Sequence, residues 1–302
     1  MDDLDFSSPA PEKPKPVKPV EPPAAAQSPL YQPAVALEFF RSAGTVESKP
    51  GGNPVFSENE KSRGMFAKGA RMYLLLEGNI GLMAGGKFVA MVKPGEIFGE
   101  LAVIARLPCT ATAFANTPCR LLSLDEKQFH AALEKKPEFA LMLMSIMVNR
   151  LRQSLAKLGA GSAPKGGPTE REGVFDKKML AWLANELSAN SPTTAPAGRV
   201  ILSAGATGAL MYVVLEGKVT ISVQDLVVER IGPGGVFGEM ALVDRSPRAA
   251  SATAESDCKL LTLGRDDFLG LVKANTAFGA SLLKSLAERM QLVAAQVAGP
   301  GK

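Results

Sequence analysis

Two short segments of the chain combine an acidic residue, glycine and small residues at matched spacing, and one of them also carries a cation. Glu239 precedes Arg248 by nine residues, and Glu100 precedes Cys109 by the same nine. An arginine presents a planar set of donors that matches phosphate oxygens, and a carboxylate accepts a hydrogen bond from a hydroxyl. The later segment therefore has the side chains for a sugar phosphate, whereas the earlier one lacks the cation.

The residues around Glu239 and Arg248 favour close approach of a ligand to the backbone. A glycine precedes Glu239, and a helical turn that begins there would present free N–H groups to an anion. Ala249 and Ala250 are small enough for their backbone amides to reach the same phosphate. The predicted binding set is Gly238, Glu239, Met240, Ala241, Arg248, Ala249, Ala250 and Ser251.

The earlier segment is predicted to be a degenerate copy. Its residues are Gly99, Glu100, Cys109, Thr110 and Ala111. Loss of one charge-assisted hydrogen bond, about 1.5 to 3 kcal/mol, would weaken binding roughly ten- to a hundredfold. We expect a structural or interaction role there, with weak ligand binding as the alternative. Arg106 is a nearby substitute cation and Cys109 a candidate reactive thiol, but a surface arginine and a small buried residue are the simpler interpretations.

The region around each segment is duplicated as a whole. Met72 corresponds to Met211 and Arg150 to Arg289, at one constant offset of 139 residues and without a gap. This offset indicates two copies of a domain, because a solenoid repeats every 20 to 50 residues or so. A chain of 302 residues accommodates two domains with tails.

Short apolar runs separated by glycine turns predict β-strands, whose number and regular spacing are typical of a sandwich or barrel. Residues 139–155 predict a helix that is buried on more than one side, and its three methionines suit packing against a second chain or domain. We divide the chain into a disordered proline-rich tail (1–33), a first domain (34–157), a flexible linker (158–172), a second domain (173–296) and a short tail (297–302).

Composition excludes several classes of protein. No run of about 18 apolar residues is present to span a membrane, and the basic residues are interspersed with acidic ones, which does not favour a nucleic-acid partner. The three scattered cysteines and an acidic N-terminus without an apolar segment indicate a cytoplasmic protein. One histidine, His130, cannot build a multi-histidine catalytic metal site. We therefore expect no enzymatic activity and no metal or other cofactor.

The two segments resemble the phosphate-binding cassette of cyclic nucleotide-binding domains, F-G-E-[LM]-A followed by P-R-A-A-[TS], and residues 237–241 and 247–251 match it throughout. The resemblance covers about residues 35–157 and 173–295. It implies a mainly β fold with flanking helices, in which two tandem double-stranded β-helices (β-rolls, jelly-roll-like) each carry a helical lid. It also implies that Glu239 binds the ribose 2′-hydroxyl and Arg248 the cyclic phosphate.

The resemblance implies a ligand preference and a mechanism as well. Family members that prefer cGMP tend to have threonine after the arginine, so Ala249 favours cAMP over cGMP. Candidate base contacts in the last helix are Arg289, Met290 and Val293. We expect a non-enzymatic sensor in which nucleotide bound to the second domain repositions its C-terminal helix and so regulates a partner protein.

Two alternatives stay open, a ligand-independent interaction scaffold and a regulatory subunit of a cyclic-nucleotide-dependent kinase. The kinase regulator also has tandem domains, but its basic inhibitor segment, R-R-x-[AS], does not occur before Val35. A transcription factor would need a helix-turn-helix after the last helix, and the chain ends at Lys302. The expected partners are the nucleotide, an effector protein, and a second copy of the chain that pairs through the C-terminal helices of the domains.

Overall fold

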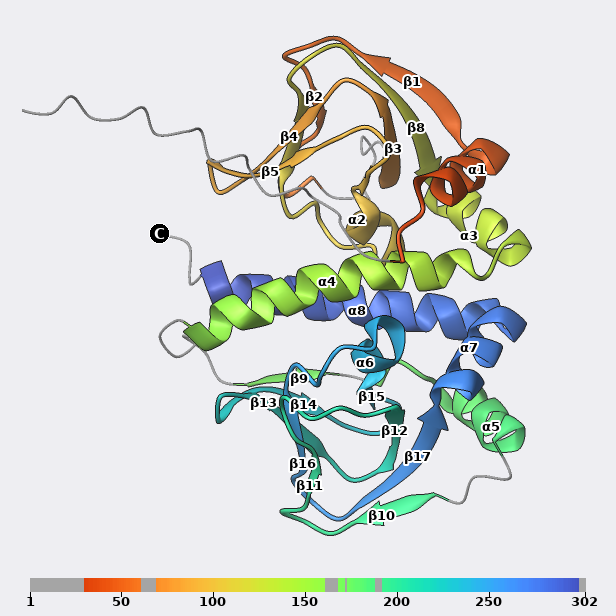
Figure 1. Cartoon of the computed structure of the whole chain (residues 1–302), viewed down its shortest axis with the longest axis vertical. Helices are drawn as coiled ribbons and strands as arrows, with labels where there is room; N and C mark the ends of the chain where they lie inside the picture. Colours follow the sequence, from red (N-terminus) through yellow and green to blue (C-terminus); the bar gives the residue numbers. More distant parts are fainter. Residues whose placement is uncertain (1–29, 61–68, 161–167, 172, 188–191, 299–302) are drawn as a thin grey trace, which may run out of the picture.

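Two β-rolls lie at opposite ends of the molecule, and two long helices run between them (Figure 1). This computed structural model describes residues 30–60, 69–160, 168–171, 173–187 and 192–298. Each roll consists of two facing sheets rather than a closed barrel. The prediction of a mainly β fold, with two tandem β-rolls and flanking helices, is confirmed.

The first roll contains two four-stranded sheets, with the orders β1-β8-β3-β6 and β2-β7-β4-β5. Apolar side chains on alternate positions of the strands meet between the sheets, where Leu75, Ile80 and Leu121 are fully buried. The strands are β1 (Thr45–Lys49), β2 (Pro54–Phe56), β3 (Arg71–Glu77), β4 (Ile80–Ala84), β5 (Lys87–Val92), β6 (Ile97–Phe98), β7 (Thr112–Ala115) and β8 (Cys119–Asp125).

The second roll repeats this plan, with the orders β10-β17-β12-β15 and β11-β16-β13-β14-β9. Its own core includes Val214, Val219 and Leu260. The strands are β9 (Thr169–Arg171), β10 (Thr193–Ala195), β11 (Val200–Leu202), β12 (Leu210–Glu216), β13 (Val219–Val223), β14 (Leu226–Ile231), β15 (Val236–Phe237), β16 (Ser251–Ala254) and β17 (Cys258–Gly264).

Strand β9 lies inside the range 158–172, which we had predicted to be a linker. It pairs in parallel with β14, from Glu229 opposite Thr169 to Ile231 opposite Arg171. The backbone groups at the edge of a sheet need partners, and a short extended segment supplies them even where its composition is typical of a linker. Residues 161–167 and 172 of the predicted linker lie outside the described residues, as do residues 1–29 and 299–302 of the predicted tails.

Eight helices flank the sheets of the described residues. They are α1 (Pro33–Ala43), α2 (Glu100–Ile104), α3 (Glu126–Lys135), α4 (Phe139–Ala160), α5 (Lys177–Glu186), α6 (Glu239–Asp244), α7 (Arg265–Ala274) and α8 (Thr276–Ala298). Asp125 and Gln128 form a capping box that fixes the start of α3 directly after β8. Within the described part of the chain, no helix has the length and apolar character to cross a membrane.

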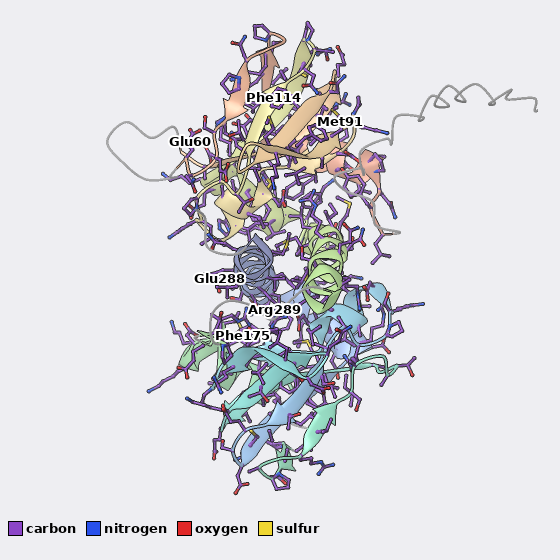
Figure 2. The ribbon with its side chains drawn as sticks, turned by 90° about the vertical axis from the view of Figure 1, so that its left-hand side faces the viewer. Glu60, Met91, Phe114, Phe175, Glu288 and Arg289 are labelled. Carbon is purple, nitrogen blue, oxygen red and sulfur yellow. The ribbon has the colours of Figure 1, made fainter. Side chains whose placement is uncertain are left out.

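Helices α4 and α8 pack side by side between the rolls, as the view along their axes shows (Figure 2). Both helices begin on the same side of the molecule, at the right in Figure 1, where α3 and α7 precede them. A Cβ atom placed on Gly279 would lie 3.4 Å from the Cβ atom of Ala140. These two residues are equivalent in the duplication, so the two domains are related by an approximate twofold axis.

The core between the helices joins the two domains into one unit. Met144, Met147, Leu283 and Leu286 are buried in a single apolar cluster that includes residues of both domains. The methionine side of α4, predicted to pack against a second chain or a second domain, therefore packs within the chain. A homodimer stays a prediction. The buried faces of α4 and α8 already pack against each other within one chain.

Candidate functional site

The predicted binding segment of the second domain forms a strand, a one-residue turn and a short helix. Gly238 has a φ of +85° and separates β15 from α6, which begins at Glu239. A Cβ atom on Gly238 would lie 3.1 Å from Arg248 Nη1 and 3.1 Å from the carbonyl oxygen of Leu210. Glycine is therefore required both for the left-handed conformation and for close approach of the arginine.

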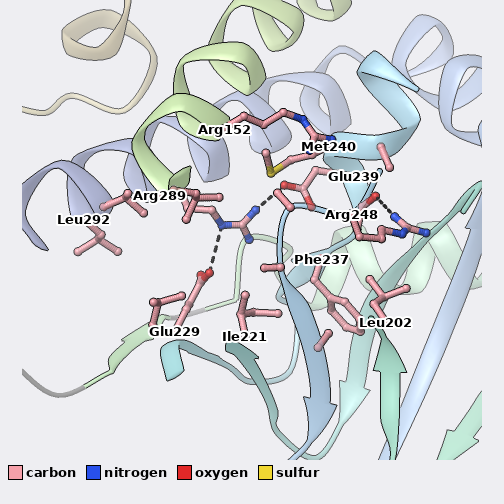
Figure 3. Close-up of a pocket in the computed structure, with 18 of the residues that line it drawn as sticks. Arg152, Leu202, Ile221, Glu229, Phe237, Glu239, Met240, Arg248, Arg289 and Leu292 are labelled. Atoms are coloured by element: carbon pink, nitrogen blue, oxygen red, sulfur yellow. Dashed lines mark hydrogen bonds and ion pairs between the residues drawn. The ribbon is translucent and has the colours of Figure 1, made fainter. Parts of the chain in front are cut away.

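A cavity opens beside this segment (Figure 3). Its lining includes every predicted cassette residue except Ser251. The hydroxyl of Ser251 instead accepts a hydrogen bond from the backbone N–H of Ala204, at 3.0 Å. Among the described residues, no cluster of three or more histidine, cysteine or acidic side chains could hold a metal ion. Most residues that line the cavity are apolar, and its charged lining residues are Arg152, Glu229, Glu239, Arg248 and Arg289.

Arg248 is a buried cation at the cavity wall. Its Nη1 donates to the carbonyl oxygen of Gly238 at 2.7 Å, and its Nη2 donates to that of Leu210 at 2.6 Å. Burial lowers the pKa of Arg248 from its ordinary value, but an arginine stays protonated in proteins. Within the described residues it forms no ion pair with a carboxylate. An anion in the cavity would supply the missing counter-charge.

Glu239 belongs to a buried network of four charged side chains. Two of them are arginines, one on α8 and one on β9. Arg289 of α8 pairs with Glu239 and donates from Nε to Glu229 at 3.1 Å (Figure 3). Arg171 of β9 pairs with Glu229 at 2.5 Å and donates to the carbonyl oxygen of Ser285 at 2.9 Å. Burial lowers the pKa of Arg289, but Glu229 and Glu239 outweigh burial and raise it above its ordinary value. This network anchors α8 on the second roll.

One oxygen of Glu239 is left over from the network. Glu239 is only 2% exposed, and its Oε2 has no hydrogen-bond partner among the described residues. Buried polar atoms are almost always satisfied, so an orphaned acceptor at a cavity indicates a donor from a ligand or water. The pair Glu239 and Arg248 therefore offers the cavity one free acceptor and one uncompensated cation.

The last helix contributes to the cavity on one face only. Arg289 and Val293 line it, as predicted, and so does Leu292. Met290 does not; it is half-buried against the apolar core that both domains share. Residues three and four apart share a helix face, whereas neighbouring residues diverge by about 100°, which explains why Leu292 replaces Met290.

The first domain also reaches this cavity, through Arg152 and Leu155 of α4. Sequence reasoning missed both, because their position depends on how the two domains pack. It also missed Thr169, Leu202, Ile221, Val228, Glu229, Phe237 and Ala252. A signal existed for Glu229, which interrupts the apolar strand β14 where the first domain has Ala90.

The equivalent site in the first domain retains its acidic residue but not its cation. Arg150 pairs with Glu100 and donates to the carbonyl oxygen of Ile97 at 3.2 Å, as Arg289 does with Glu239 and Val236. Where Arg248 lies in the second domain, the first has a cavity whose lining includes Gly69, Arg71, Tyr73 and Cys109.

Neither nearby arginine of the first domain replaces Arg248. Arg71 donates to Glu47 at 3.2 Å and to Ser123 at 2.9 Å, so its charge is compensated. Arg106 pairs with Glu126 at the surface. Among the residues that the structure describes, the first site therefore offers no uncompensated cation comparable with Arg248.

We predict that Cys109 reacts slowly with thiol reagents. Burial, with a smaller contribution from Glu60, raises the pKa of Cys109 from 9.0 to about 11. Because only the thiolate reacts, this higher pKa should slow alkylation at pH 8 roughly a hundredfold relative to the chain unfolded in urea. The rate of alkylation of the folded chain should keep rising as the pH approaches 11. Mass-spectrometric mapping of the alkylated peptide measures this rate. Rapid labelling of the folded chain would instead support a reactive thiol.

Comparisons with known proteins give matches to both domains. A family model described as the cyclic nucleotide-binding domain matches residues 48–136 and 192–275. A cAMP-dependent protein kinase regulatory subunit of Yarrowia lipolytica is 28% identical over 212 residues, which are 68% of this chain and 50% of the subunit. A cyclic nucleotide-gated potassium channel of Rhizobium etli is 36% identical over 116 residues, which are 38% of this chain and 32% of the channel.

Among solved structures, the regulatory domain of Toxoplasma gondii PKA in complex with cAMP is 22% identical, with a TM-score of 0.28, and the match covers 79% of this chain and 85% of that one. The chain thus spans about half the length of the kinase subunit and a third of that of the channel.

Proposed function

Because the chain belongs to the cyclic nucleotide-binding domain family, with two such domains in tandem, we propose that its second domain binds a cyclic nucleotide and its first domain has a structural and interaction role. Arg248 carries this proposal, since it is a buried cation at a cavity and has no carboxylate partner among the described residues. The cyclic phosphate supplies the anion. No catalytic step is needed, so the protein acts as a sensor.

Each part of the nucleotide has a counterpart in the cavity. The cyclic phosphate accepts hydrogen bonds from Arg248 and from the backbone amides of Ala249 and Ala250. The ribose 2′-hydroxyl donates to Oε2 of Glu239, the orphaned acceptor. The base occupies the apolar part of the cavity, where Val293 of α8 lies. This assignment gives the phosphate to the uncompensated cation Arg248 and a hydroxyl to the orphaned oxygen of Glu239.

Thermal unfolding with and without nucleotide tests the proposal. A ligand that binds only the folded state stabilises it by about 2.7 kcal/mol at a concentration a hundred times its Kd, so cAMP should raise the melting temperature in a concentration-dependent way. The control is 5′-AMP, whose phosphate is an open monoester with a second negative charge and does not form the cyclic phosphodiester. It should have a much smaller effect on the melting temperature. No shift with cAMP or with cGMP would favour the ligand-independent scaffold.

We predict that Ala249 determines the preference for cAMP. In Ala249→Thr, a hydroxyl next to Arg248 can bond the guanine amino group, and one net hydrogen bond of about 1 kcal/mol should raise cGMP affinity roughly fivefold. Calorimetric titration with cGMP measures this gain. The matched control is Thr110→Ala, the reverse change at the equivalent position of the first domain, which should leave cGMP affinity unchanged. Equal effects of the two variants would contradict the assignment of the site to the second domain.

The signal leaves the site through α8, which carries Arg289 and lines the cavity with Val293. Nucleotide shifts the population of α8 positions relative to α4 and so changes the surface presented to an effector protein. Relatives that are kinase regulatory subunits make a kinase the first effector to test, by capture of a kinase that cAMP then releases. A cytoplasmic location and the lack of membrane or nucleic-acid partners stay predictions.

A further inference from the structure

Arg152, on α4 of the first domain, lies beside the cassette of the second domain (Figure 3). Its Nε donates to Oδ2 of Asp244 at 2.5 Å and its Nη2 to Oδ1 at 3.0 Å, while Nη1 donates to the carbonyl oxygen of Pro247 at 2.8 Å. All three nitrogens of the guanidinium therefore donate to one four-residue segment, from Asp244 to Pro247. A bidentate pair of this kind fixes the orientation of the carboxylate relative to the guanidinium as well as the distance between them.

The groups that Arg152 contacts lie between the two predicted ligand-binding side chains. Asp244 ends α6, the helix that begins at Glu239, and Pro247 immediately precedes Arg248. Oδ1 of Asp244 also accepts from the backbone N–H of Ser246 at 3.0 Å. Arg152 thus stabilises the far end of the segment whose near end is Gly238, and the segment's conformation sets the separation of Glu239 from Arg248.

The backbone of this segment passes through a left-handed conformation, as it does at the equivalent Arg106 of the first domain, whose φ is +55°. Arg245 has a φ of +58°, a left-handed conformation that side-chain-bearing residues rarely adopt. Residues in such conformations persist where surrounding contacts hold them. Arg152 bonds the residues on either side of Arg245, Asp244 and Pro247, and so supplies a contact of that kind from another domain.

The twofold relationship of the domains provides an internal comparison. The residue equivalent to Arg152 is Gln291, and the residue equivalent to Asp244 is Ala105. The second domain therefore cannot make the same contact to the first cassette. The first cassette is also the one that has Cys109 in place of the arginine. The cassette of the second domain therefore has both Arg248 and the contact from Arg152, whereas the cassette of the first domain has neither an equivalent arginine nor an equivalent contact.

We propose that Arg152 is a positioning residue for the nucleotide site of the second domain, so that the first domain sets the affinity of the second through α4. This inference rests on the proposed function of that site. Without the contact, a smaller fraction of molecules would have the cassette in its binding conformation, and the apparent affinity would fall by that fraction. Linkage also requires that bound nucleotide stabilises the contact in return.

The test uses the full chain and two substitutions taken from the equivalent positions, Arg152→Gln and Asp244→Ala. Calorimetry with cAMP should show about a tenfold higher Kd for each variant, and the double variant should be no weaker than either single one, because both remove the same contact. The control is Arg230→Gln, which breaks the exposed pair with Glu255 in the same domain and should leave Kd within about twofold.

Hydrogen exchange separates positioning from a contribution to folding alone. In the wild type, cAMP should slow amide exchange in α4, and in Arg152→Gln it should not. Unchanged Kd in both variants, or a lower melting temperature with unchanged Kd, would overturn the inference and leave the proposed function intact. Additive losses in the double variant would also overturn it. A wild type that binds neither cAMP nor cGMP would overturn both.

Discussion

Arg248→Ala is expected to weaken cAMP binding roughly a hundredfold. Two charge-assisted hydrogen bonds to a phosphate together contribute about 3 kcal/mol, and each 1.4 kcal/mol is a factor of ten in Kd. The remaining cassette amides hold the phosphate less tightly without the cation. Calorimetric titration of the intact chain measures the change.

Three comparisons make this result specific. Arg248→Lys keeps the charge but loses the planar fork, so its loss of affinity should lie between those of the wild type and the alanine variant. Cys109→Ala changes the equivalent residue of the first domain and should not alter Kd. Melting of Arg248→Ala without nucleotide checks that the carbonyl oxygens of Gly238 and Leu210, which lose their donor, do not disturb the fold. Full affinity in Arg248→Ala would exclude the proposed site.

Arg289→Met is expected to have the largest effect on stability, a loss of about 3 to 5 kcal/mol in the free energy of unfolding. Removing one partner of a buried ion pair leaves the other as an uncompensated charge, which costs more than losing the pair's own attraction. Arg289 bonds both Glu229 and Glu239, which are 5% and 2% exposed. Urea unfolding followed by the fluorescence of Trp182, the only tryptophan, reports on the second domain.

Arg150→Met is the matched control for this substitution. Arg150 is the equivalent residue of the first domain, and its side chain is 22% exposed, against 10% for Arg289. Greater exposure to solvent lowers the cost of leaving Glu100 without its partner. Circular dichroism in urea should therefore show a smaller loss for Arg150→Met than for Arg289→Met. Equal losses would mean that the second glutamate, Glu229, contributes nothing to the network.

The cassette could be predicted from the sequence because its geometry is local. Gly238 and Glu239 lie in one strand–turn–helix segment, and Arg248 lies four residues beyond the end of that helix, while the positive φ and close packing at Gly238 favour glycine. The two β-rolls could be predicted for a related reason: glycine turns and alternating apolar residues recur in both copies of the duplication. In each case, residues near one another in the sequence determine the structure.

The rest of the site depends on contacts between segments far apart in the sequence. Arg152 reaches the cavity only because α4 packs against α8, and Arg171 reaches Glu229 only because β9 adds to the edge of β14. Met290 was predicted and Leu292 was missed because the helical pattern does not fix which face of α8 turns to the second roll. The pairing of the two domains was thus the information that the sequence pattern lacked.

A calorimetric titration of the intact chain with cAMP tests the central claim most directly, that one nucleotide site lies in the second domain. The account predicts a single binding event with a stoichiometry of one nucleotide per chain. Two sites of equal affinity, or no heat of binding with cAMP or cGMP at any concentration that saturates the nucleotide sites of other family members, would contradict it.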